Sequence, residues 1–99
     1  MSFVTTQPEM LAAAAGNFQT IGSAMAANNS AVAGPTSGVI PAAADEVSAL
    51  TAKQFAMHAA MYQTISAQAA AIHQQFVATL AASAASYATT EAANALVAG

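Results

Sequence analysis

The chain has 99 residues, enough for one small domain, and a domain of this size buries only a modest fraction of its surface when it folds alone. It is 57% hydrophobic but only 5% charged, with a formal net charge of −3, whereas ordinary globular domains are about a quarter charged. Lys53 is the sole lysine or arginine, which excludes the cationic surface that nucleic acids require, and the absence of cysteine excludes disulfides and thiolate metal sites.

The first predicted element is a helix over residues 8–33. Pro8 is tolerated at the first helical position, and the Glu9 carboxylate favours the positive end of the helix dipole, with Thr6 or Gln7 as the cap. Apolar residues then recur at spacings of three and four, apart from a break near Asn28 and Asn29. This predicted stripe consists of Leu11, Ala14, Phe18, Ile21, Met25 and Val32.

The string GPTSGVIP, from Gly34 to Pro41, contains two glycines and two prolines and predicts the turn that ends this helix. Asp45 and Glu46 then repeat the acidic signature of a first helical turn. We therefore expect a second and longer helix over about residues 42–84, followed by a tail over 85–99.

The second predicted helix is apolar on two sides, so it requires two neighbours. One seam consists of Phe55, His58, Tyr62, Ile65, Ala69, Ile72, Phe76 and Leu80, and the other of Val47, Leu50, Met57, Met61 and Val77. We expect ordinary packing, rather than a methionine-lined binding groove, for Met25, Met57 and Met61.

Helix lengths lead to the same expectation of a partner. In an antiparallel hairpin, the first helix would run out opposite residue 67. The side chains of Ile72, Phe76, Val77 and Leu80 would then project beyond it, with only Phe3 and Val4 available to cover them. The predicted fold is thus all-α, an antiparallel two-helix hairpin that completes a four-helix bundle with a partner chain. Periodicity leaves open whether that partner is a second copy or a different protein.

Residues that could perform chemistry are scarce. His58 and His73 would lie about 22 Å apart along one helix, too far to share a metal or a proton. Four scattered carboxylates form no catalytic pair, and GPTSG lacks the lysine of a phosphate-binding loop. We therefore expect no enzyme activity, no metal and no cofactor.

Tyr87 and Glu91 stand four residues apart, beyond the predicted end of the hairpin. Such a spacing describes a helix-surface pair worth a few tenths of a kcal/mol. A tyrosine at this place has no obvious core to fill, however, so a signal that another protein reads is an equal alternative.

The sequence carries the signals of neither a membrane span nor a conventional leader. No stretch reaches the roughly 20 apolar residues of a membrane span, and MSFVTTQPEM has neither the basic nor the apolar region of a Sec signal peptide. A membrane-active or channel-forming helical hairpin at an outer membrane is retained as an alternative to the interaction module, and a homodimeric bundle of the small WxG type as a third.

Four segments together resemble the PE family of mycobacteria. They are Pro8-Glu9, PAAADEVSAL from Pro41 to Leu50, YQTISAQAAAIHQQFV from Tyr62 to Val77, and the Tyr87 to Glu91 motif. The resemblance covers the chain from Met1 to about Ala98. It implies one PE domain over residues 1–99 that forms a heterodimer with a PPE-family protein and is exported by type VII (ESX) secretion machinery.

The resemblance also implies roles for particular residues. Tyr87 and Glu91 match the family's Tyr-x-x-x-Asp/Glu secretion motif, which lies beside a Trp-x-Gly turn of the partner, and Pro8 and Glu9 match the pair that names the family. An EspG-type chaperone is expected to bind the dimer in the cytoplasm mainly through the PPE chain, before export to the cell surface or the medium. The predicted partner interface consists of Leu11, Phe18, Ile21, Met25, Phe55, Tyr62, Ile65, Ile72, Phe76 and Leu80.

Overall fold

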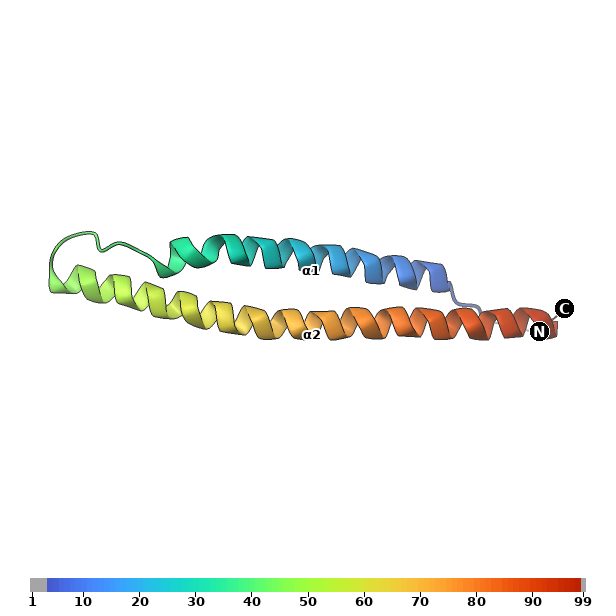
Figure 1. The fold of residues 1–99 in the computed structure, drawn as a ribbon. Helices are drawn as coiled ribbons and strands as arrows, with labels where there is room; N and C mark the ends of the chain where they lie inside the picture. Colours follow the sequence, from blue (N-terminus) through green and yellow to red (C-terminus); the bar gives the residue numbers. More distant parts are fainter. Residues whose placement is uncertain (1–3, 99) are drawn as a thin grey trace. The chain divides into compact units, whose positions relative to one another are not determined.

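A computed structural model of the protein describes residues 4–98, and in this part of the chain all regular structure is α-helical. Helix α1 comprises Pro8–Ser37 and helix α2 comprises Glu46–Ala98, joined by a segment of bends over residues 38–45 (Figure 1). The predicted all-α fold with two long helices is confirmed. Phe3 lies outside the described residues.

Helix α1 begins where the sequence predicts and ends later. The carbonyl oxygen of Gln7 accepts hydrogen bonds from the backbone N–H groups of Met10 and Leu11, so Gln7 occupies the cap position before Pro8. The helix continues through Pro35 to Ser37, four residues past the predicted end. The hydroxyls of Thr36 and Ser37 donate to the carbonyls of Val32 and Ala33, each at 2.6 Å, which supports this last turn.

Helix α2 begins later than predicted and ends much later. Asp45 is its cap rather than a first-turn residue, because the Ser48 N–H donates to Asp45 Oδ1 at 2.7 Å. That hydrogen bond lowers the pKa of the Asp45 carboxyl below its usual value. The helix starts at Glu46 instead of residue 42 and continues to Ala98. Residues 85–98 are therefore helical, since their alanine-rich sequence contains no glycine or proline.

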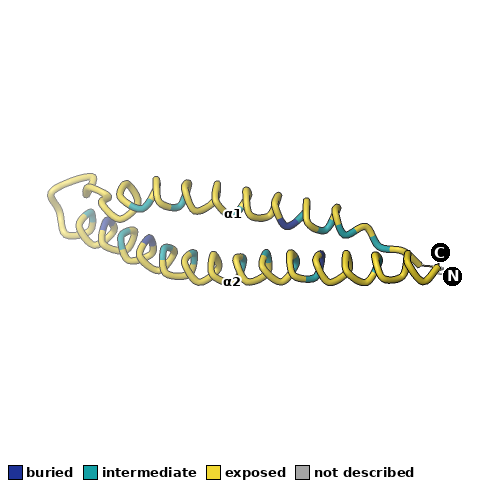
Figure 2. Tube along the Cα trace, turned by 45° about the vertical axis from the view of Figure 1, so that its right-hand side comes forward, coloured by how far each residue is buried: buried dark blue, intermediate teal, exposed yellow. Residues whose placement is uncertain are grey.

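The chain divides into two compact units, and both helices contribute to each. Unit 1 comprises Met1–Gly22 with His73–Gly99, and unit 2 comprises Ser23–Ile72. Within each unit, a segment of α1 packs beside a segment of α2 that runs in the opposite direction. The less exposed positions lie on the sides of the helices that face each other (Figure 2).

The helix sides that face each other carry mainly small residues. Among residues 4–98 the buried apolar side chains are four alanines, Ala15 and Ala84 in unit 1 and Ala52 and Ala59 in unit 2. On α2 the least exposed positions recur mainly at spacings of three, four and seven, and we call them the inner seam. The inner seam consists of Ser48, Ala52, Ala56, Ala59, Gln63, Ser66, His73, Val77, Leu80, Ser83, Ala84 and Glu91.

The register of the helices differs from the predicted one. In unit 1, the ring of Phe18 lies 5.4 Å from the ring of Phe76, and Thr6 contacts Glu91. Helix α1 therefore does not run out before Phe76, so the predicted overhang of Ile72, Phe76, Val77 and Leu80 is wrong. In unit 2, Asn29 contacts Tyr62, which places Ser37 level with about residue 54 of α2.

The connecting segment explains this difference. A tight turn between the helices is predicted, but residues 38–45 form bends and irregular backbone beside the first turns of α2 (Figure 1). A residue outside a helix can cover up to about 3.3 Å, whereas a helical residue rises about 1.5 Å, so eight such residues can span the first two turns of α2. In unit 2, the part of α2 that extends beyond α1 is thus its beginning.

Candidate functional site

In unit 1, a pair of hydrogen bonds links the segment before α1 to the last third of α2. The backbone N–H of Thr6 donates to Glu91 Oε1 at 2.9 Å, and the Thr6 hydroxyl donates to the same oxygen at 3.0 Å. Both residues are half-buried. We call this contact the N-terminal clasp; it joins two residues 85 positions apart in the sequence.

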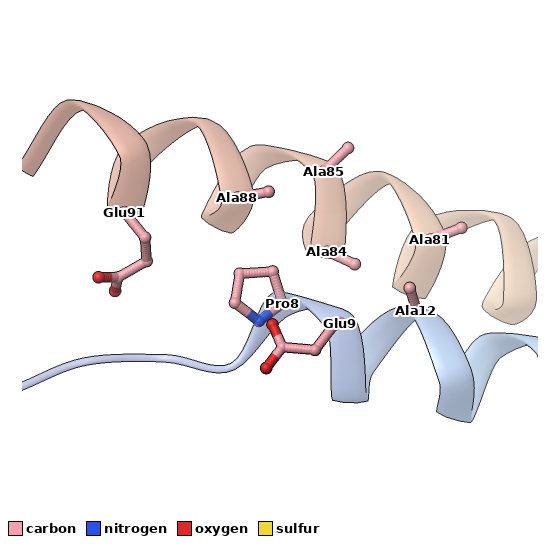
Figure 3. Close-up of a pocket in the computed structure, with 8 residues that line it drawn as sticks. All are labelled: Pro8, Glu9, Ala12, Ala81, Ala84, Ala85, Ala88 and Glu91. Carbon is pink, nitrogen blue, oxygen red and sulfur yellow. The ribbon is translucent and has the colours of Figure 1, made fainter. Parts of the chain in front are cut away.

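Beside the clasp lies a groove of about 580 Å³. Its floor is apolar and formed by alanines of both helices, and Pro8, Glu9 and Glu91 lie along it (Figure 3). The family-motif pair Pro8-Glu9 and one half of the predicted secretion motif therefore border a single surface feature. The sequence predicts each pair but not their juxtaposition.

Tyr87 lies one helical turn before Glu91 and is 46% exposed. Helix α2 continues for more than two turns beyond it, so the tyrosine projects from a regular helix and not from a tail. Tyr87 therefore lies at the surface of unit 1, whereas Glu91 is hydrogen-bonded to Thr6 of the same chain.

An aromatic cluster joins the two helices in unit 1. Phe18 makes edge contacts with the rings of His73 and Phe76, at 6.2 and 5.4 Å between centroids. The Nε2–H of His73 donates to the carbonyl oxygen of Phe18 at 2.6 Å. A Cβ added at Gly22 would lie only 2.7 Å from the His73 ring, so Gly22 provides the space that this ring occupies.

In unit 2, a polar cluster joins the two helices, as the aromatic cluster does in unit 1. The Tyr62 hydroxyl donates to Asn29 Oδ1 at 2.8 Å, and the Gln63 side-chain amide donates to the Asn29 carbonyl oxygen at 2.9 Å. Asn29 interrupts the apolar stripe in the sequence, and the structure gives the reason: its polar groups face hydrogen-bonding partners on α2.

The residues predicted for the partner interface fall into two groups. Leu11 and Leu80 are half-buried toward the opposite helix. The other eight are exposed in the single chain, between 39% for Phe18 and 66% for Ile72. Met25, Met57 and Met61 are also more than half exposed, so packing within this chain does not cover the methionines.

Most of these exposed side chains form what we call the outer stripe. On α2 it consists of Phe55, Tyr62, Ile65, Ile72 and Phe76, and on α1 of Met10, Ile21, Met25 and Val32. At 100° per residue, the outer stripe lies about 90–110° around each helix from the side that faces the other helix. Viewed from the N-terminus of each helix, the outer stripe is displaced in the same rotational direction from the side that faces the other helix. Because the helices of a unit are antiparallel, both parts of the stripe lie on the same side of the pair.

Residues 4–98 contain no cluster of three or more histidine, cysteine or acidic side chains that could hold a metal ion. Neither α1 nor α2 is apolar enough over its length to cross a membrane.

Sequence reasoning missed the inner seam and the clasp for different reasons. The seam has a weak signal, since the small residues Ala52, Ala59 and Ser66 repeat at heptad spacing, but the prediction rested on the large apolar residues. The clasp has none, because Thr6 and Glu91 belong to opposite ends of the chain.

Comparisons with known proteins agree with these observations. The sequence model of the PE family matches residues 4–94. The PE family protein PE13 of Mycobacterium tuberculosis is 68% identical over 98 residues, which cover 99% of both chains. PE8 of the same organism is 52% identical and PE_PGRS33 56% identical, but there the match covers only 36% and about a fifth of the longer relatives. The chain belongs to the PE family of mycobacterial proteins.

Proposed function

We propose that the protein is a non-enzymatic interaction module that forms a heterodimer with a PPE-family protein and is exported through a type VII (ESX) system. The observation that carries the heterodimer proposal is that two sides of α2 differ in the size and exposure of their side chains. Its inner seam places mainly small residues against α1, whereas Ile65 and Ile72 of its outer stripe are 59% and 66% exposed. Exposed apolar side chains gathered on one side of a helix mark an interface.

The geometry of the stripe indicates the form of the partner. Each helix of a four-helix bundle contacts two neighbours, on sides about a quarter turn apart. The inner seam and the outer stripe have this angular separation on both helices, and both parts of the stripe lie on one side. A second helical pair therefore covers them most simply, at crossing angles near 20°.

Co-expression tests the heterodimer. The chain, produced alone or together with each of a set of candidate PPE-family proteins, should be soluble only with its partner and should co-purify with that partner in equal amounts. The matched variants Ile65→Ser and Ala71→Ser change one exposed position on and one off the outer stripe. Ile65→Ser alone should reduce co-purification, and a chain that unfolds cooperatively as a lone monomer would contradict the proposal.

The second part of the proposal assigns the secretion motif to Tyr87 and Glu91. It is supported by the exposure of Tyr87 on a regular helix and by its one-turn separation from Glu91. Before export, an EspG-type chaperone would bind the dimer through the PPE chain. In a mycobacterial host, Tyr87→Ala and Glu91→Ala should abolish export of the dimer without preventing its assembly, as measured by immunoblots of culture filtrate and by pull-down from lysate.

A further inference from the structure

The acidic residue of the predicted secretion motif has a partner within its own chain. Glu91 Oε1 accepts two hydrogen bonds from Thr6, one from the backbone and one from the hydroxyl. Tyr87, the other motif residue, is instead 46% exposed. The two residues of the motif are therefore in different situations, and only the tyrosine presents its side chain mainly to the surface.

The clasp fixes the place of the segment that leads into α1. Gln7 caps α1 and Pro8 begins it, so a hydrogen-bonded Thr6 holds this helix start against the α2 residues 84–91. The groove between Pro8, Glu9 and the alanines of α2 has Glu91 at its border (Figure 3). Loss of the clasp would leave the segment before α1 without this link to α2.

We propose that Glu91 is a positioning residue, whose carboxylate holds the segment before α1 against α2 so that both ends of the chain form one recognition surface around Tyr87. This inference rests on the export function proposed above and deepens it. The recognised feature is then the tyrosine with the clasped N-terminal segment beside it, rather than a free negative charge at residue 91.

The distinction can be tested because glutamine keeps the hydrogen-bond acceptor and removes the charge. In Glu91→Gln, the amide oxygen can accept both hydrogen bonds from Thr6. In Thr6→Val, the hydroxyl donor is lost while Glu91 and its charge remain. Thr6→Ser restores the donor, and Thr5→Val is the matched control at the exposed neighbouring position.

Two readouts are needed, both on the full chain co-expressed with its partner. The first is amide hydrogen exchange at Thr6, whose N–H is one of the two donors. It should accelerate about tenfold or more in Glu91→Ala, roughly fivefold in Thr6→Val, and little in Glu91→Gln or Thr5→Val. The second is the exported fraction in a mycobacterial host, which should fall in Glu91→Ala and Thr6→Val and remain near normal in the other variants. In the Glu91→Ala background, Thr6→Val should have no further effect on either readout.

The opposite pattern would overturn the inference. If Glu91→Gln is exported as poorly as Glu91→Ala while Thr6→Val is exported normally, the charge itself is read. Thr6 exchange that does not respond to Glu91→Ala would exclude the clasp. If exchange responds as expected but Glu91→Ala and Tyr87→Ala are both exported normally, the clasp exists, and both the positioning role and the proposed export motif are wrong.

Discussion

The two units hold their helices together by different means. In unit 1, aromatic rings and the N-terminal clasp connect α1 to α2, with Phe18, His73 and Phe76 in mutual contact. In unit 2, the buried side chains are the alanines Ala52 and Ala59, and the specific contacts are hydrogen bonds to Asn29. The comparison shows how an alanine-rich chain can place its side chains. Small residues permit close approach of the helices, and most large apolar side chains are left facing outward.

The largest expected effect concerns Phe76, which takes part in the aromatic cluster of unit 1 and also belongs to the outer stripe. Phe76→Ala should destabilise the complex with the partner by roughly 3–5 kcal/mol, because an aromatic side chain buried in the complex would leave a cavity. The measurement is denaturant unfolding of the co-purified complex. A loss below about 1 kcal/mol would mean that the partner does not cover this side chain.

A second prediction tests the close approach of the helices in unit 2. Ala59→Leu should destabilise the complex by about 1–3 kcal/mol, because the inner seam has no room for a larger side chain. Ala71→Leu, at an exposed position of the same unit, is the matched control and should be nearly neutral. Equal thermal unfolding temperatures for the two variants would contradict the small-residue packing of unit 2.

A third prediction compares two glycines of α1 within unit 1. Gly16 has no atom within 4 Å of an added Cβ, so Gly16→Ala should stabilise the helix by about 0.5–1 kcal/mol. Gly22→Ala should instead destabilise by about 1 kcal/mol, because the methyl group would displace the His73 ring from its hydrogen bond to Phe18.

The background His73→Ala provides the control for this comparison. Without the ring, Gly22→Ala should become stabilising, like Gly16→Ala. Thermal unfolding of the four variants checks the sign, and a Gly22→Ala variant that is stabilising with His73 intact would exclude the close approach.

The smallest expected effect is the pH dependence of the start of α2 in unit 2. The hydrogen bond from the Ser48 N–H lowers the pKa of Asp45 in the folded chain, so its stabilising contribution is present above the unfolded value of about 3.8. That contribution is lost as the pH falls through the folded pKa. Asp45→Asn keeps a capping side chain without a titrating group. Helicity of the wild type, measured by circular dichroism between pH 2 and 6, should show a small acid-dependent loss that Asp45→Asn lacks.

Much of the fold was predictable from local signals. Pro8 and Glu9 mark the start of α1, and Asp45 and Glu46 mark the start of α2 to within a few residues. The lengths were less predictable, because the Gly34-Pro35 pair was expected to end α1 at residue 33, and hydroxyl groups support another turn. The end of α2 was missed because a functional tail was expected where alanine propensity maintains a helix.

The site residues were predictable by type and less so by arrangement. Eight of the ten residues predicted for the partner interface are exposed large apolar side chains in the single chain, and their place in an interface stays a prediction. The register of the two helices was not predictable, because it depends on whether residues 38–45 form a tight turn or a longer irregular connection.

The sequence by itself determined that this chain forms two long helices with more apolar surface than one helical neighbour can cover, and that it carries the motifs of the PE family. These are properties of local composition and periodicity. Only the tertiary structure decided that alanines form the contact between the helices, that Phe18 reaches Phe76, and that Glu91 binds Thr6. Such pairings depend on the path of the chain between the helices, and residues 85 positions apart carry no local signal that they will meet.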